Sequence, residues 1–301
     1  MNLFQLFQQK LQRGSLVILL FSFLACVSFD KSELNNLNNN DVLKIGHAGS
    51  GFSSWIPFNP YPANSYNSLR KAIVDNKADG IEVDVHMTAD GEFVLYHDNK
   101  LESKTNQKGC ISELNYNEIL GAQYQLGLPF DWFQSETVIG LDSLISLMKA
   151  QKEFPYLHLD IRHYSVCLTA SETRKRELIL IKRLMEKLES LEVPKQKVVL
   201  VSLSHEVILE AKRLNCPYEL SLEETADFMH GLNWAKKQKL DYLTIKPDLL
   251  TAEYSKIAHS QGIKVITFGA KSKSGNKRLL KLNPDVIQTN NLKALGELLE
   301  N

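Results

Sequence analysis

Cysteine, net charge and long apolar runs are all scarce in this chain of 301 residues. Its four cysteines include no Cys-x-x-Cys pair, which argues against a zinc site. Lysine plus arginine and aspartate plus glutamate both number 35, so no global field attracts nucleic acid or a membrane. The apolar run at residues 15–25 is too short to span a bilayer. Any phosphate must therefore be bound by a local site.

The composition is that of an ordinary globular protein, with 44% hydrophobic and 23% charged residues, and it is sufficient for a large core. Three cysteines, at positions 110, 167 and 216, lie beyond the first 30 residues. Their odd number allows at most one disulfide among them. The favoured interpretation is that all three are small buried side chains.

The first 25 residues have the pattern of a signal peptide. Lys10 and Arg13 precede the apolar run, as the charged start of such a segment does. The sequence ending at Cys26 (Phe-Leu-Ala-Cys) is similar to a bacterial lipobox and predicts a lipid anchor on Cys26; ordinary secretion and an uncleaved N-terminal anchor are the alternatives. We expect an exported bacterial protein, either periplasmic or anchored to the outer membrane, that contacts the membrane only through this anchor.

Residues 26–41 are polar, rich in asparagine and without periodicity, which predicts a linker. From residue 42 onward, short apolar runs alternate with longer amphipathic ones. Strands are predicted at 42–47, 80–85, 156–162, 197–202, 217–221, 241–246, 263–268 and 285–289. Helices are predicted at 64–77, 141–152, 171–192, 204–215, 223–239, 251–260, 275–282 and 291–300.

This eightfold strand–helix alternation predicts a (β/α)8 TIM barrel over residues 42–301. An open doubly wound sheet is the alternative, but no glycine-rich dinucleotide turn follows the first strand. A tight turn is predicted at Thr88-Ala89-Asp90-Gly91, because Asp-Gly supplies the positive φ values that a two-residue hairpin loop needs. The segment 99–140 interrupts the alternation and is predicted to be an insertion after the second barrel strand. It either covers the barrel mouth and shapes the pocket, or forms a packing subdomain.

Polar residues collect at the C-terminal ends of the predicted strands, where TIM barrels carry their active sites. They are His47, Glu82, Asp84, Asp160, Arg162, Ser202, Ser204, Lys246, Thr267, Thr289 and Asn290. Glu82 and Asp84 are two residues apart on one strand, so their carboxylates face the same side, about 6.6 Å apart along it. Like charges this close call for a cation or a proton between them.

Three carboxylates around one mouth, from Glu82, Asp84 and Asp160, predict an oxygen-ligand site for Mg²⁺ or Ca²⁺. Arg162 beside them would suit a phosphate oxygen; the alternative for Asp160 and Arg162 is an ion pair inside the barrel. A lone histidine is more often a core residue than a catalyst. Two of them at strand ends, His47 and His97, favour acid/base catalysis.

The series of motifs resembles the glycerophosphodiester phosphodiesterase family over residues 42–295. The matching stretches are His47-Ala48-Gly49, Pro62-Ala63-Asn64-Ser65, Gly80-Ile81-Glu82-Val83-Asp84-Val85, Thr88-Ala89-Asp90-Gly91, His97-Asp98 and Leu159-Asp160-Ile161-Arg162. Weaker similarity is present at 201–204 and 285–290. The order and spacing of these motifs are specific to the family, whereas no single one of them is.

The resemblance implies a phosphodiesterase-type TIM barrel that cleaves glycerophosphodiesters to glycerol 3-phosphate and an alcohol. It further implies that Glu82, Asp84 and Asp160 hold a divalent cation, Mg²⁺ or Ca²⁺. His47 and His97 would then be the acid/base pair. Arg162 takes the place of the family's phosphate-binding lysine.

Several positions depart from the family pattern. Ala48 and Ala63 stand where the family has arginine and glutamate, a loss of one charge of each sign, and Asp160 is one methylene shorter than the family glutamate. The stretch 50–61 is longer than expected. Its Trp55 is a candidate for the substrate pocket together with Lys246, although an ordinary packed loop is the favoured interpretation of that stretch.

Two other functions are compatible with the same residues. One is a non-catalytic lipoprotein that binds phosphate or a phospholipid head group, which the loss of the arginine at position 48 favours. The other is a phospholipase D or a phosphorus–oxygen lyase acting on lysophospholipids. Both histidines and all three acidic positions are retained, and this favours an enzyme. We expect a monomer acting on a small-molecule phosphodiester.

Overall fold

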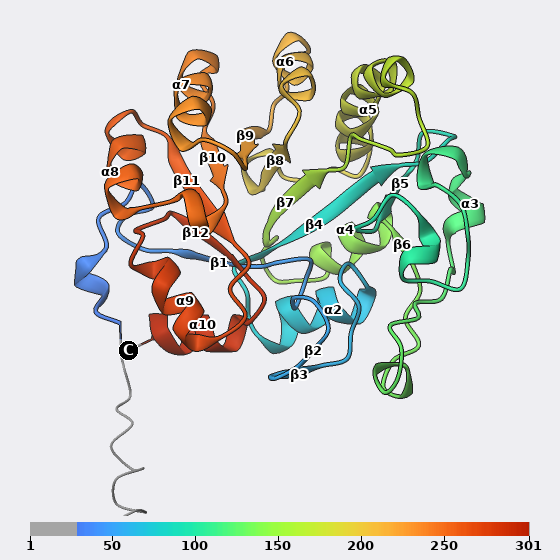
Figure 1. The fold of residues 1–301 in the computed structure, drawn as a ribbon, viewed down its shortest axis with the longest axis horizontal. Coiled ribbons are helices and arrows are strands. Elements are labelled where there is room, and N and C mark those ends of the chain that lie inside the picture. The colour runs from blue at the N-terminus through green and yellow to red at the C-terminus, as the bar shows by residue number, and fades with distance from the viewer. Residues whose placement is uncertain (1–28, 301) are drawn as a thin grey trace, which may run out of the picture.

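A computed structural model describes residues 29–300 of the chain (Figure 1). The predicted signal peptide and the predicted anchor at Cys26 lie outside these residues. Among the residues described, no helix is long and apolar enough to cross a bilayer.

The centre of the molecule is a closed barrel of parallel strands, as predicted (Figure 1). The order β1-β12-β11-β10-β9-β8-β7-β4 is closed by pairing between β1 and β4, with Ile45 opposite Gly80. The strands are β1 (Leu43–Gly46), β4 (Gly80–Met87), β7 (Tyr156–Ile161), β8 (Val198–Ser202), β9 (Glu219–Glu224), β10 (Tyr242–Ile245), β11 (Lys264–Phe268) and β12 (Val286–Thr289). Closure brings the C-terminal ends of all these strands to one mouth.

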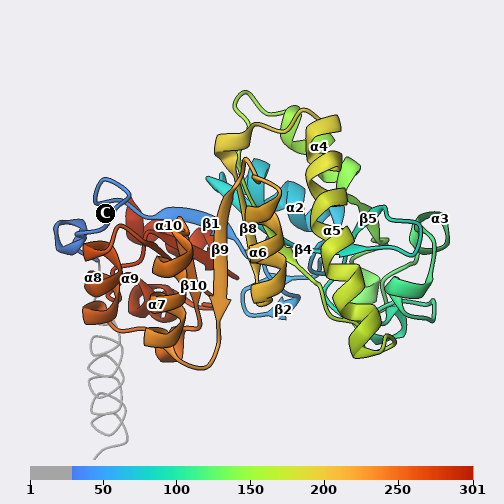
Figure 2. The same cartoon turned by 90° about the horizontal axis from the view of Figure 1, so that it is seen from above.

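Helices surround the barrel (Figures 1 and 2). They are α2 (Tyr66–Arg70), continued by a π-helical turn (Lys71–Asp75), α4 (Leu141–Lys149), α5 (Ala170–Ser190), α6 (His205–Arg213), α7 (Phe228–Gln238), α8 (Ala252–Ser260), α9 (Lys273–Leu280) and α10 (Leu292–Leu299). The longest helix, α5, illustrates how the sequence sets the start of a helix and its buried face. Thr169 and Glu172 form a capping box at its start, and Leu180, Leu184 and Leu188 form its buried stripe.

The main core lies between the helices and the outer face of the barrel. A second apolar cluster fills the barrel interior below the mouth, with Ile45, Val199, Val201, Tyr242, Ile266 and Val286 as its buried members. The polar pair His158 and Gln288 is also buried there, at 3.2 Å. Side chains therefore fill the barrel interior, and a substrate could be bound only at the mouth.

The predicted insertion has a core of its own. Strands β5 (Phe93–Leu95) and β6 (Ile139–Gly140) extend the sheet beside β4, and α3 (Tyr116–Ile119) and short 3-10 turns (Leu101–Ser103, Ile111–Glu113, Phe130–Trp132) fill the segment between them. Val94, Tyr96, Leu101, Ile111, Ile119, Ala122, Tyr124 and Val138 pack together under it. A disulfide joins Cys110 of the insertion to Cys167 in the loop before α5. The favoured interpretation of these two cysteines as reduced core residues is thus wrong, and the limit of one disulfide is met.

Two local predictions need correction. The helix predicted at 223–239 begins at Phe228, because β9 continues to Glu224. In the hairpin loop, Thr88 pairs with Glu92 across the turn, and only Gly91 has a positive φ. The loop therefore has three residues rather than two.

The segment 29–41, predicted as part of a linker, packs on the barrel. Phe29 and Leu34 are 2% and 4% exposed and join a cluster with residues of α9 and α10. The amide of Asn36 donates to the carbonyls of Asp41 and Pro284. Its asparagines therefore fix backbone groups in place, which composition alone did not indicate. A two-stranded hairpin, β2 (Ser54–Trp55) and β3 (Phe58–Asn59), follows β1.

Candidate active site

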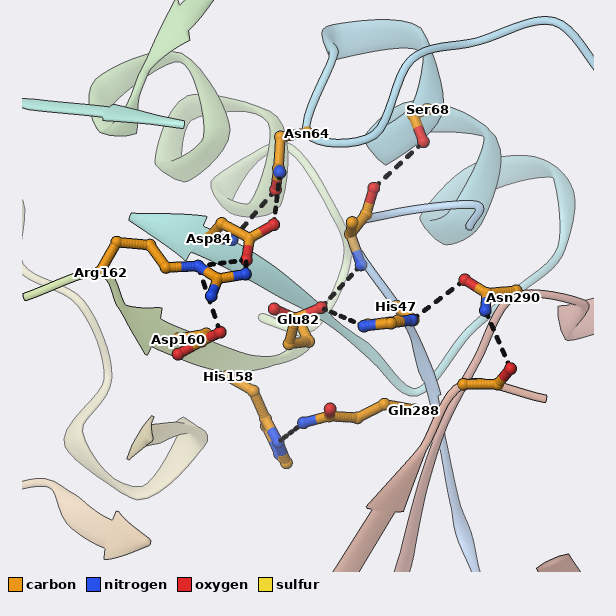
Figure 3. Close-up of polar contacts among 12 residues, drawn as sticks. His47, Asn64, Ser68, Glu82, Asp84, His158, Asp160, Arg162, Gln288 and Asn290 are labelled. Atoms are coloured by element: carbon orange, nitrogen blue, oxygen red, sulfur yellow. Dashed lines mark hydrogen bonds and ion pairs between the residues drawn. The ribbon is translucent and has the colours of Figure 1, made fainter. Parts of the chain in front are cut away.

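Three buried carboxylates meet at the barrel mouth (Figure 3). Glu82 and Asp84 come from β4 and Asp160 from the neighbouring β7, where it lies directly opposite Asp84. Their side chains are 3%, 2% and 8% exposed, and one oxygen of each lies within 4.8 Å of the others. Hard divalent cations prefer such a set of carboxylate oxygens. The donor set therefore fits Mg²⁺ or Ca²⁺.

Two residues with left-handed backbones hold the β4 carboxylates. Ala48 (φ 48°) donates its backbone N–H to Oε2 of Glu82 at 2.7 Å. Asn64 (φ 64°) donates its side-chain amide to Oδ2 of Asp84 at 2.7 Å and accepts the backbone N–H of Asp84. The two turns are themselves joined, because the N–H of Asn64 donates to the carbonyl of Ala48. The geometry of the acidic pair is thus fixed by loops that precede it in the chain.

Arg162 supplies the positive charge at this cluster (Figure 3). Its guanidinium donates to Oδ1 of Asp84 through Nε at 2.8 Å and through Nη2, and its Nε lies 3.5 Å from Oδ2 of Asp160. This is the ion pair that the sequence offered as an alternative to phosphate binding. One arginine thus neutralises part of the charge of three carboxylates.

The environment separates the pKa values of the three acids. Burial and the charges of Asp84 and Asp160 raise the pKa of Glu82 well above its ordinary value. Burial also raises the pKa of Asp160, to about 6. Burial acts in the same direction on Asp84, but the Arg162 guanidinium and the Asn64 amide outweigh it and hold the pKa of that carboxyl below its usual range. Ionisation is therefore disfavoured at Glu82 and Asp160 and favoured at Asp84.

His47 follows β1 and is oriented by Asn290. Nδ1 of His47 lies 3.0 Å from Oδ1 of Asn290, while the amide nitrogen of Asn290 donates to the carbonyl of Gly269 at 3.1 Å. Because that second bond fixes the amide, the Asn290 oxygen must accept and Nδ1 must carry the proton. Nε2 of the neutral ring then carries a lone pair and points toward Glu82, 3.9 Å from its Oε2. Burial lowers the pKa of His47 and favours this neutral form.

His97 has the same type of support. Its Nδ1 lies 2.7 Å from Oδ1 of Asp98, so a carboxylate holds that proton and leaves Nε2 for the cavity. The Phe52 ring packs edge-on against both imidazoles, 5.3 Å from His47 and 5.5 Å from His97 between centroids. The two histidines therefore line one cavity.

These groups line a cavity of about 240 Å³. Its walls include His47, Glu82, His97, Asp160, Arg162, Glu223, Thr244, Phe268 and Gln288. Glu223, at the end of β9, is a fourth acid that the sequence reasoning missed, because that stretch was assigned to a helix. Burial and the charge of Asp160 raise its pKa to about 8. Asn64 and Asn290 were visible in the motifs but had been given no role.

Lys246 and Trp55, the two further pocket candidates, are not in this cavity. Lys246 follows β10 with an exposed side chain. Trp55 is 59% exposed on the β2–β3 hairpin and packs on Phe58 and Phe130.

Comparison with known proteins matches the chain to one family. The sequence model of the "Glycerophosphoryl diester phosphodiesterase family" matches residues 57–294. A glycerophosphodiester phosphodiesterase of Caldanaerobacter subterraneus is 24% identical over 243 residues, 79% of this chain and 92% of that protein. One of Bacillus altitudinis is 41% identical over 59 residues, which cover 20% of this chain and only 24% of the relative.

Solved structures share the fold at low identity. A phosphodiesterase of Oleispira antarctica, in complex with the product sn-glycerol-3-phosphate, has a TM-score of 0.72 at 19% identity and covers 90% of this chain and 98% of that one. A glycerophosphodiester phosphodiesterase of Parabacteroides distasonis has a TM-score of 0.67 at 20% identity and covers 85% and 95%.

Proposed function

This chain belongs to the glycerophosphoryl diester phosphodiesterase family, a family of phosphoric diester hydrolases, and from that premise we propose that it is metal-dependent and uses two histidines. The proposed reaction cleaves a glycerophosphodiester to glycerol 3-phosphate and an alcohol. The observation that carries the proposal is a cluster of three buried carboxylates, two of which line one cavity together with two oriented imidazoles.

Glu82, Asp84 and Asp160 are the residues that would hold the cation. When bound, a divalent cation would neutralise phosphate oxygens and polarise the phosphorus for attack. Three acids line this cavity, namely Glu82, Asp160 and Glu223, and in their ionised forms they would repel a phosphodiester without such a cation. Mg²⁺ and Ca²⁺ both suit these oxygen ligands.

Arg162 is proposed to bind a phosphate oxygen. In the structure its guanidinium is bonded to Asp84 and faces the reaction cavity. A planar guanidinium has five donors, so it can keep one carboxylate and still offer donors to the substrate. Its positive charge would stabilise the charge that develops on the phosphoryl oxygens.

The two imidazoles are proposed to move the protons. Each has its Nδ1 proton held from behind, by Asn290 in one case and by Asp98 in the other, so each presents Nε2 to the cavity. One Nε2 accepts the proton of the attacking hydroxyl or water while the other delivers a proton to the leaving alkoxide.

We also propose that the protein acts outside the cytoplasm. The disulfide between Cys110 and Cys167 is of a kind that persists in oxidising compartments. This supports export by the predicted signal peptide, with a lipid anchor on Cys26 as the proposed form of attachment and a monomer as the proposed state.

The test is release of glycerol 3-phosphate from glycerophosphocholine by wild type, His47→Ala and His97→Ala. Each alanine variant is expected to lose roughly 10²–10⁴ of kcat, the usual contribution of one acid/base group. His230→Ala is the matched control, because that side chain is 62% exposed on α7 outside the cavity. A wild type that binds glycerophosphocholine without product release would support the non-catalytic alternative. Near wild-type activity of either alanine variant would contradict the assignment of the pair.

A further inference from the structure

One wall of the reaction cavity is built by three adjacent strands. Glu223 lies near the end of β9, Thr244 is its register partner on β10, and Phe268 ends β11. In the closed barrel, β10 is separated from β4 by β9, β8 and β7 on one side and by β11, β12 and β1 on the other. This wall therefore lies across the mouth from the strand that carries Glu82 and Asp84.

The carboxylate of Glu223 has no partner in the wall. It accepts no hydrogen bond and forms no ion pair within the part of the chain that the structure describes. Its neighbour Glu224, on the opposite face of β9, differs in this respect, because it accepts the backbone N–H groups of Ala226 at 2.7 Å and of Asp227 at 3.2 Å. Acids that line a cavity are ordinarily paired, so the group that Glu223 would bind is absent from the chain itself.

The charges of the site indicate that this group is a cation. Arg162 and the proposed divalent cation would together supply three positive charges, which balance the three carboxylates of Glu82, Asp84 and Asp160. Glu223 is then the acid of the cavity that has no counter-charge. Burial and the charge of Asp160 raise the pKa of Glu223, and a cation beside it would act in the opposite direction.

Phe268 supplies an aromatic ring on the same wall. Because neighbouring strands lie about 4.8 Å apart, the backbones of Glu223 and Phe268 are about 10 Å apart across β10. Thr244 lies between them with a small side chain, and its hydroxyl is hydrogen-bonded to that of Ser221 at 2.8 Å. A carboxylate and an aromatic face on either side of such a space are the groups that bind an organic ammonium ion.

We propose that Glu223 and Phe268 bind an ammonium group on the leaving alcohol, and so determine which head groups the enzyme prefers. The proposal rests on the function proposed above and names the residues that select its substrates. A phosphodiester bound by the cation and Arg162 would extend one of its ester groups across the mouth to this wall. Choline and ethanolamine carry an ammonium group two carbons from the ester oxygen, whereas glycerol carries none.

The test compares three substrates that release the same product. Glycerol 3-phosphate is measured from glycerophosphocholine, glycerophosphoethanolamine and the uncharged-head-group substrate glycerophosphoglycerol, each with Mg²⁺ or Ca²⁺. The quantity of interest is the ratio of kcat/KM for each ammonium substrate over glycerophosphoglycerol. Because this ratio is compared between wild type and variants, the intrinsic reactivity of the leaving alcohols cancels.

A matched pair of variants on one strand assigns the effect to Glu223. Glu223→Gln keeps the shape of the side chain and removes its charge, and we expect it to lower the ratio roughly tenfold, which corresponds to about 1.4 kcal/mol. Glu224→Gln makes the same change on the outer face of β9 and should leave the ratio unchanged. Phe268→Leu should lower the ratio for glycerophosphocholine by roughly threefold, the effect of a cation–π contact at a partly exposed site. Thermal unfolding checks that all three variants fold.

The outcomes separate this proposal from the proposed function. No glycerol 3-phosphate from any substrate would overturn the proposed function, and with it the ammonium site. Cleavage of all three substrates with the same ratio in wild type and Glu223→Gln would leave that function standing and overturn the ammonium site. An equal loss of activity on all three substrates in Glu223→Gln would mean that Glu223 binds the divalent cation or the glycerol shared by these substrates, which also overturns it.

Discussion

Nδ1 of His47 lies 3.0 Å from Oδ1 of Asn290, and the other end of that amide is fixed by the carbonyl of Gly269. The imidazole of His47 is therefore held in one tautomer by a residue at the opposite end of the barrel sequence. Closure of the barrel brings β1 beside β12, which makes the contact possible. Orientation of the proposed acid/base group thus depends directly on the fold.

We predict that Asn290→Ala lowers kcat about tenfold, because loss of a hydrogen bond worth about 1.4 kcal/mol frees the ring of His47 to change tautomer. Asn290→Asp retains an acceptor at the same place and should restore most of the activity. Steady-state kinetics on glycerophosphocholine checks both. A merely structural role for Asn290 would be indicated if the two variants lost activity and thermal stability in parallel.

The titration of Glu223 predicts a loss of stability at alkaline pH. Its pKa is raised from the usual 4.5 to about 8, so near pH 7 the folded protein binds a proton that the unfolded chain has released. The stability that this proton contributes is fully present below the unfolded pKa of 4.5 and is lost progressively as the pH rises from there; the last part of the loss falls between about pH 7 and 8. The histidines with lowered pKa values do not disturb this window, because they are neutral in both states there.

Melting temperatures in EDTA across this pH range check the effect. Wild type should lose stability more steeply than Glu223→Gln, which has no proton to release. Glu186→Gln, at a side chain that is 54% exposed on α5, is the control and should follow wild type. Parallel curves for wild type and Glu223→Gln would show that the Glu223 carboxyl is already ionised at pH 7.

The Cys110–Cys167 disulfide closes a loop with a sequence separation of 57 residues between the insertion and the segment before α5. We predict that the double serine variant has a free energy of unfolding lower by roughly 2–4 kcal/mol, since the link restricts the unfolded chain. Urea denaturation measures the change. Cys216→Ser, at the free cysteine, should have a far smaller effect. Equal stability of the double variant and wild type would mean that the bond does not form in the protein.

The barrel and its acidic residues were accessible from sequence because both follow simple periodicities. Strand–helix alternation gave the eight barrel strands, and the two-residue spacing of Glu82 and Asp84 placed both carboxylates on one face. Glu223 was missed for a physical reason: two consecutive glutamates before an apolar stretch are typical of a helix start, and only pairing with β10 keeps them in a strand. Local propensity was overridden there by tertiary context.

The residues that hold the site side chains in place could not be predicted, because their contacts depend on backbone conformation and on residues far away in the sequence. Asn64 holds Asp84 only because its own φ is 64°, and nothing in the spacing of the motif indicates that. A second cavity, of about 410 Å³, is formed where the insertion approaches the loop after β1. Packing of residues 29–41 similarly depends on Asp285 and Pro284, about 250 positions away along the chain.

The central claim is that Glu82, Asp84 and Asp160 bind one divalent cation. Calorimetric titration of Mg²⁺ and Ca²⁺ into EDTA-treated, dialysed protein tests it most directly. We predict one site per chain for wild type, and for Asp160→Asn an affinity reduced about 10- to 100-fold, because a neutral amide replaces one of only three carboxylate ligands. Absence of binding by wild type, or unchanged affinity in Asp160→Asn, would contradict the account.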